Sequence, residues 1–126
     1  MNRTIERDLE GSILLFHRTT LPRAKAILKE GFRDGSVKYG RSIKFEGVWV
    51  ANVPLAPDQG VKGSVILQIN IDLSEQELSD YEWKEVRLDH REWLIPAQVL
   101  NTRGRLAVAG GENEANAVLS GYQDHS

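Results

Sequence analysis

The chain has 126 residues, which is enough for one domain with one core and too few for two. Its 16 basic and 18 acidic residues nearly cancel to a formal charge of -2, so no chain-wide positive field points to nucleic acid or an anionic membrane as the main partner. The absence of cysteine excludes disulfides and a cysteine nucleophile, and three histidines without ligand spacing predict no metal site. A charged N-terminus and the lack of a long apolar run predict a cytoplasmic protein with no membrane partner.

Residues 13–31 predict a short buried strand followed by an amphipathic helix. Ile13 to Phe16 is an apolar run, Pro22 suits a first helical position, and Gly31 follows the last residue with helical spacing. By alternation His17 lies at the end of the strand, on the same face as its buried residues. An isolated histidine in this place most often bonds a neighbouring turn, and it is also the first candidate for a functional residue.

The next segment, residues 33–46, predicts a loop because it is rich in glycine, serine and cations and lacks apolar periodicity. Its Arg41 and three other cations would suit a phosphate-bearing ligand, and Tyr39 offers a ring for stacking. GVWVA, residues 47–51, predicts a strand in which glycine and alanine flank Trp49 on one face. A flat ligand could lie against that indole, although a buried core tryptophan is the commoner outcome.

The remaining segments predict mainly strands. Residues 64–72 alternate cleanly, and Ser74 and Glu77 form a capping box that predicts a helix to about Tyr81. Further strands are predicted at 82–88, 92–95, 98–100 and 105–108, and a mobile tail from 110 to 126. We therefore predict an α+β fold with mainly antiparallel sheets, as a single domain 1–126 with an ordered core of about 11–109.

Glu92 is the second candidate, because alternation places it on the same face as Leu94. A carboxylate on an apolar face is costly unless it is paired or used in chemistry. An ion pair with Arg91 or Arg87 is the structural alternative to a catalytic role.

Three segments together resemble one family. LLFHRTT with AILKEGFR, then GVWVA, then REWLIPAQV are similar in order and chemistry to the motifs of the ADP-ribosyltransferase superfamily, in its His-aromatic-Glu branch. Poly-ADP-ribose polymerases and diphtheria-like toxins belong to this branch, and the short chain resembles its small bacterial-type members. The resemblance spans about Ser12 to Leu100 and implies split β-sheets around an NAD cleft, with a helix early in the chain.

The resemblance also implies residue roles. His17 would hold the adenosine-side ribose of NAD, Thr19 would support that strand end, Trp49 would stack on nicotinamide, and Glu92 would be the catalytic carboxylate. A fixed carboxylate stabilises the positive charge that develops on the ribose as the nicotinamide bond breaks. Arg18 replaces a glycine whose backbone grips the nicotinamide amide in many members, a contact that a backbone can keep.

These roles predict a mono-ADP-ribosyltransferase that consumes NAD and modifies an unknown acceptor, which could be a protein, a small molecule or a nucleic-acid end. Tyr39 and Arg41 would join the NAD-binding residues from the cationic segment, near the pyrophosphate. Two alternatives stay open. One is a module that binds ADP-ribose or NAD without catalysis, and the other is an enzyme like the RNA 2′-phosphotransferases, which share the fold but do not rely on a late glutamate.

Overall fold

The computed structural model describes residues 3–39, 43–55, 63–84 and 89–120, and within them the chain has an α+β fold. The strands are β1 Ile13–Thr19, β2 Gly35–Tyr39, β3 Ile43–Ala51, β4 Val65–Ile71, β5 Glu82–Trp83, β6 Glu92–Ile95 and β7 Gly104–Gly110. The helices are α1 Leu21–Glu30, α2 Glu75–Ser79, α3 Ala97–Arg103 and α4 Glu112–Leu119. No helix in these ranges has the length and apolar character needed to cross a bilayer.

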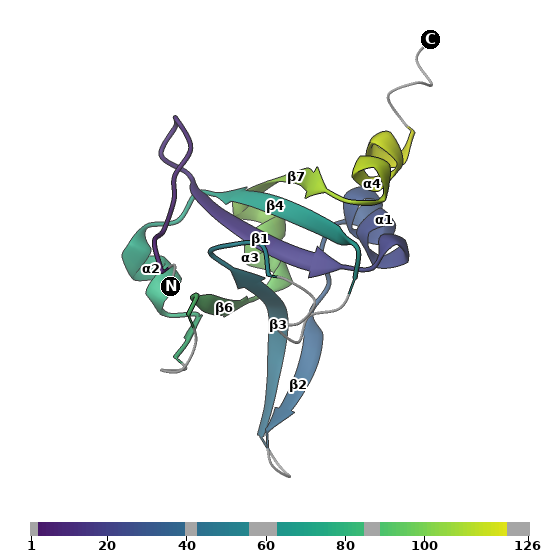
Figure 1. Ribbon diagram of the computed structural model, residues 1–126. Coiled ribbons are helices and arrows are strands. Elements are labelled where there is room, and N and C mark those ends of the chain that lie inside the picture. Colours follow the sequence, from purple (N-terminus) through teal and green to yellow (C-terminus); the bar gives the residue numbers. More distant parts are fainter. Residues whose placement is uncertain (1–2, 40–42, 56–62, 85–88, 121–126) are drawn as a thin grey trace.

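All the strands pair antiparallel, in the order β5-β6-β3-β1-β4-β7, and β2 pairs with β3 off this path (Figure 1). β1 pairs with β4 along its whole length, from Ile13 opposite Ile71 to Thr19 opposite Val65. By contrast, β1 and β3 are joined through the single pair Phe16 and Ala51. The sheet therefore parts between β1 and β3, immediately beyond the position of His17.

The core lies between the sheet and helices α1 and α3. In β4 every second residue is buried, which is the pattern of a sheet with one covered face, and β1 follows the same pattern except at His17, which is half-buried. Trp93 of β6 is the largest fully buried side chain, and Leu100 of α3 and Ala24 of α1 pack in the same cluster. The strands that carry the candidate residues are thus anchored from beneath by one continuous core.

Both predicted helix signals are confirmed. Thr20 caps α1 by accepting the Arg23 N–H, and Gly31, with a φ of 90°, ends the helix. This φ suits glycine, and a Cβ there would come within 2.9 Å of the Asn101 amide oxygen. In α2 the Ser74 hydroxyl accepts from the Glu77 N–H at 3.0 Å, and the Glu77 carboxylate accepts from the Ser74 N–H at 2.9 Å.

Two predicted assignments are wrong. Residues 33–46 were expected to form a loop, but β2 and the start of β3 pair there as a hairpin, with Gly35 opposite Gly47. Backbone pairing requires no apolar periodicity, so the pattern did not reveal these strands. Residues 98–100 were expected to be a strand but belong to helix α3, in which Ala97 and Leu100 are buried at helical spacing.

The chain ends differ from the expectation as well. The strand predicted at 82–88 is present at Glu82–Trp83, and residues 85–88 lie outside the described residues. In place of the predicted tail from residue 110, helix α4 follows β7 and buries Ala115 completely. Every residue from Glu112 to Ser120 has a φ between 44° and 67°, a left-handed conformation that costs L-residues about 1–2 kcal/mol each. Residues 121–126 of that predicted tail are outside the described part of the chain.

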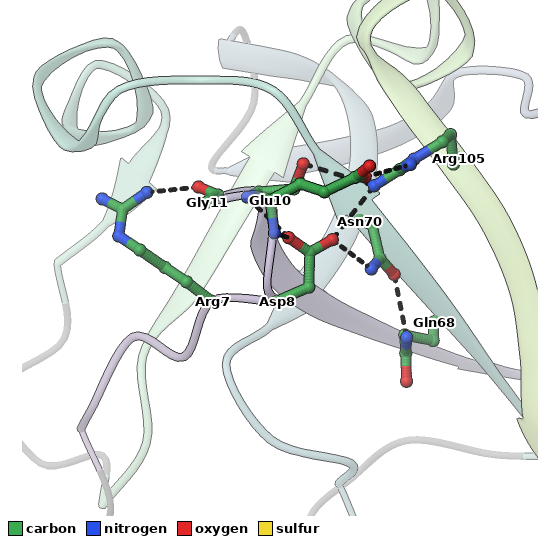
Figure 2. A network of polar contacts seen from close by, with 8 residues as sticks. Arg7, Asp8, Glu10, Gly11, Gln68, Asn70 and Arg105 are labelled. Atoms are coloured by element: carbon green, nitrogen blue, oxygen red, sulfur yellow. Dashed lines mark hydrogen bonds and ion pairs between the residues drawn. The ribbon is translucent and has the colours of Figure 1, made fainter.

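The segment before β1 forms a turn that is bound to β4 and β7, as Figure 2 shows. Asp8 Oδ1 accepts the N–H groups of Glu10 and Ser12 at 2.8 and 2.9 Å, and Asp8 Oδ2 accepts from Asn70 at 2.8 Å and Arg105 at 3.0 Å. The hydrogen bond from Asn70 is the main cause that lowers the pKa of Asp8. These contacts extend the ordered part of the chain beyond the predicted start near residue 11.

Candidate functional site

A cavity of about 350 Å³ opens where β1 and β3 part. It lies between β1, the inner face of α1, the turn after α1, and the paired ends of β2 and β3. Its lining residues are His17, Thr19, Arg23, Ala26, Ile27, Glu30, Gly31, Phe32, Arg33, Gly35, Gly47, Val48 and Trp49. The volume is at the lower end of the range for small-molecule sites, roughly 300–1,000 Å³.

His17 is held in one orientation at this opening. Its Nδ1 lies 2.7 Å from the backbone oxygen of Trp49, and its ring meets Phe32 edge-on with centroids 5.6 Å apart. A carbonyl oxygen only accepts, so Nδ1 carries the proton and donates. Burial lowers the pKa of His17, the nearby charge of Arg23 lowers it further, and the bond to Trp49 partly opposes both.

The neutral ring that results has its Nε2 as a bare acceptor. No hydrogen bond from a described residue reaches Nε2, and His17 is a lining residue of the cavity. Thr19, two positions along β1, also lines the cavity and is buried. This end of the site therefore suits a ligand hydroxyl, which can donate to the imidazole nitrogen.

Trp49 forms the opposite part of the lining, on β3. Its indole meets the Trp83 ring edge-on at 5.3 Å, and Trp83 meets Phe45 in the same way at 5.4 Å. Gly47, the preceding residue on the same face, leaves space for β6, because a Cβ there would come within 3.0 Å of Leu94. The half-buried indole is thus braced by Trp83, and Trp49 is also one of the three consecutive β3 residues that line the cavity.

Glu92 is a diagonal neighbour of Trp49 on the adjacent strand β6. In the β3–β6 pairing Trp49 is opposite Leu94 and Ala51 is opposite Glu92, so these four side chains share a face of the sheet. Glu92 is not among the residues that line the 350 Å³ cavity, and its side chain is 22% exposed. The predicted site residues thus meet in part: His17, Thr19 and Trp49 line the cavity, whereas Glu92 lies outside its lining, on the strand next to β3.

The described partner of Glu92 is His90, which the sequence did not suggest, and not Arg91. Its Oε2 lies 2.7 Å from Nε2 of His90, whereas Arg91 forms a two-pronged pair with Glu82 at 2.9 and 3.0 Å. Arg87, the other predicted partner, is outside the described residues. The hydrogen bond from Arg91 is the main cause that lowers the pKa of Glu82. The Arg91 expectation was wrong because a residue and its neighbour in a strand point to opposite faces.

Three other predicted NAD-binding residues are not brought to the cavity by described contacts. The Arg18 side chain donates to the backbone oxygens of Leu55 and Gly63, so it braces the segments on either side of residues 56–62. Tyr39 is described as the last residue of β2 but its side chain is not, and Arg41 lies outside the described residues. The role predicted for Arg18 was a backbone contact, which these side-chain hydrogen bonds do not test.

Sequence reasoning missed Arg23, Phe32 and His90. Arg23 is on the cavity side of α1 with Ala26, Ile27 and Glu30, and this i, i+3, i+4, i+7 spacing was readable from the sequence. His90 is two positions from Glu92, a spacing that places two residues of an extended chain on one side. Phe32 had no such signal, because its approach to His17 depends on how the turn after α1 folds back.

The charges of the lining favour an anionic ligand. Arg23 and Arg33 contribute two positive charges, and Glu30 contributes the one negative charge among the lining residues, 3.3 Å from Arg33. Together the cavity offers an aromatic wall, a hydroxyl-accepting imidazole and two guanidinium groups, which suits a nucleotide better than a simple apolar molecule. No family model matches the sequence, and no match was found among curated proteins or solved structures.

Proposed function

We propose that the protein is an NAD-dependent mono-ADP-ribosyltransferase with an ADP-ribosyltransferase-like fold, in which the parting of β1 from β3 forms the NAD cleft. It would transfer ADP-ribose to an acceptor and release nicotinamide. The observation that carries the proposal is the joint lining of one cavity by His17, Thr19 and Trp49. Trp49 follows the other two by 30 or more residues, and the three come from two of the three resembling motifs.

The cavity chemistry supports a position for NAD. The indole of Trp49 would stack on the nicotinamide ring, and Nε2 of His17 would accept from a ribose hydroxyl; both residues line the cavity. Arg23 and Arg33 supply positive charge for the phosphates. A volume of about 350 Å³ suits part of a dinucleotide, so the remainder would extend out of the cavity, along the face that Trp49 shares with Glu92.

Glu92 would act on the bond between nicotinamide and ribose. Nicotinamide leaves with the electron pair of the C–N bond, and the ribose carbon becomes an oxocarbenium ion. A carboxylate held next to this carbon stabilises the positive charge as it develops, without reorganising at that moment. The acceptor nucleophile then forms the new bond to the same carbon, and Glu92 takes its proton. A short acceptor-side surface and a single candidate catalytic glutamate give no reason to expect chain elongation.

The test is nicotinamide release from NAD by the purified protein, with water and with cell extracts as acceptor. We expect Glu92→Gln to lower the rate at least about a hundredfold, as the loss of a preorganised charge-stabilising group does. Glu114→Gln removes an exposed carboxylate on α4 and is expected to leave the rate unchanged. Labelled NAD in the extracts would identify the acceptor. Absence of release in every mixture, or equal rates for Glu92→Gln and the wild type, would refute the catalytic proposal.

A second candidate is a module that binds NAD or ADP-ribose without catalysis. Two observations favour it: Glu92 is outside the lining of the cavity, and the Arg18 side chain is bound to backbone oxygens. Titration calorimetry with NAD and ADP-ribose separates the two functions. Binding that Trp49→Ala weakens, with no nicotinamide released over hours, would identify the module, and no binding of either nucleotide would refute both.

A further inference from the structure

We infer that His90 is the positioning residue for Glu92: it holds Oε2 of the carboxylate and leaves Oε1 to face the reacting ribose. This inference rests on the proposed transferase function for its chemical consequence. The pairing itself rests only on geometry, namely the 2.7 Å separation between His90 Nε2 and Glu92 Oε2. No hydrogen bond from a described residue reaches Glu92 Oε1, so the two oxygens are not equivalent.

The proton in this contact belongs to His90. An ionised carboxylate only accepts hydrogen bonds, so Nε2 must carry the hydrogen. Nδ1 of the same ring is buried and has no partner among the described residues. A proton moved to Nδ1 would bury an unpaired N–H, which is unfavourable, and Glu92 would lose its donor. The contacts of both ring nitrogens therefore favour the tautomer with its proton on Nε2.

Burial keeps the imidazole in place. The His90 side chain is 7% exposed, compared with 22% for Glu92, so the donor is the fixed member of the pair. A carboxylate restrained by a buried donor loses freedom to rotate before substrate arrives. Preorganisation of this kind helps catalysis because the charged group has no need to reorient as the transition state forms.

Contacts on both sides of His90 fix its backbone. Arg3 donates to the backbone oxygen of His90 at 2.8 Å. Asn52, the residue after β3, bridges Arg91 by accepting its N–H at 2.8 Å and donating its own N–H to the Arg91 oxygen at 3.1 Å. Arg91 in turn grips Glu82. The start of β6 is thus bonded to β3, β5 and the N-terminal segment, and the imidazole is aimed from a rigid base.

The kinetic test compares His90→Phe with His90→Gln. Phenylalanine keeps a buried ring but has no donor, whereas glutamine provides an N–H that can reach the carboxylate. We expect His90→Phe to lower kcat for nicotinamide release by about tenfold to a hundredfold, the scale of a misplaced catalytic group. KM for NAD should stay within about twofold of the wild type, because the lost contact acts in the transition state. His90→Gln should recover most of the rate.

A merely structural role would give a different pattern. Rates are normalised to the number of NAD sites from calorimetry, so a misfolded fraction does not count as slow enzyme. A change in KM with kcat preserved, or equal kcat for His90→Phe and the wild type, would overturn the positioning role. Equal losses in His90→Phe and His90→Gln would overturn the claim that the N–H group is what matters.

An independent readout is the nitrogen-15 spectrum of the histidine rings near neutral pH, with His17→Gln and His90→Gln variants for assignment. His90 is expected to carry its proton on Nε2 and His17 on Nδ1, so the two rings should give opposite patterns. Glu92→Leu should change the His90 signals and leave those of His17 in place. A His90 proton on Nδ1 would overturn the pairing. If the wild type releases no nicotinamide, the proposed function and the catalytic role both fail, whereas this spectrum still decides whether the pair exists.

Discussion

Asn101 on α3 is expected to stabilise the cavity although it is in a different element from every residue that lines it. Its Oδ1 accepts the Phe32 N–H at 2.8 Å, and its Nδ2 donates to the Phe32 oxygen at 3.0 Å. Phe32 is 6% exposed, so its backbone groups have little access to water as a substitute partner. The Phe32 ring packs edge-on against His17. Asn101→Ala therefore removes the two hydrogen bonds that hold Phe32 at one edge of the site.

The expected loss follows from the number of bonds. A hydrogen bond contributes about 0.5–1.5 kcal/mol net, so the two bonds to Phe32 predict that Asn101→Ala lowers the free energy of unfolding by about 1–3 kcal/mol. Asn101→Asp keeps the acceptor for the Phe32 N–H but places an oxygen against the Phe32 oxygen. It should therefore also destabilise the fold at neutral pH. Thr102→Ala is the matched control, because Thr102 is exposed and bonds only within α3, and it should change stability by less than about 0.5 kcal/mol.

Urea unfolding followed by tryptophan fluorescence measures these changes, and all variants should share one m-value if only the folded state is affected. Asn101→Ala should also weaken NAD or ADP-ribose binding, since Phe32 would no longer hold the His17 ring at its edge. If Asn101→Ala is within about 0.5 kcal/mol of the wild type in stability, the two hydrogen bonds to Phe32 do not stabilise the fold. Wild-type stability of Asn101→Asp would show that the bond to the Phe32 oxygen is not made.

Three further predictions concern stability. Because burial lowers the pKa of His17, the unfolded state takes up a proton at this residue before the folded state does as pH falls below about 6.5. Stability should therefore fall by up to about 1.4 kcal/mol per pH unit until the lower folded pKa is reached. His17→Gln should remove this pH dependence, as measured by urea titrations at several pH values. Ser74→Ala should cost about 1 kcal/mol at neutral pH through loss of the capping box, measured against an exposed Ser79→Ala control. Glu82→Gln leaves Arg91 without its charged partner and should lower the free energy of unfolding by about 2–4 kcal/mol. Since the pKa of Glu82 is lowered from 4.5, the wild type should be more stable than the variant above pH 4.5, and this difference should disappear as pH falls through the lower folded pKa.

The sequence alone predicted the parts of the fold that depend on local rules. The capping box of Ser74 and Glu77, the stop at Gly31 and the alternation of β4 are all properties of a few adjacent residues, and all are present. The same rules failed for the β2–β3 hairpin and for α3. A hairpin is held by backbone pairing that any exposed sequence can make, and α3 has only two buried positions to signal its period.

In the candidate site, too, the sequence predicted the local features and the tertiary structure decided the rest. The sequence determined that Trp49 and Glu92 each alternate with apolar neighbours, because the directions of side chains along a strand are local. It also predicted that His17 would end its strand, but β1 continues to Thr19 because Arg18 and Thr19 pair with β4. Only the tertiary structure decided that β1 parts from β3, that His17 donates to the Trp49 backbone, and that Glu92 is held by His90 while Arg91 turns to Glu82. These contacts depend on which strands become neighbours and in what register, and that is set by the burial of the whole core and not by any one segment.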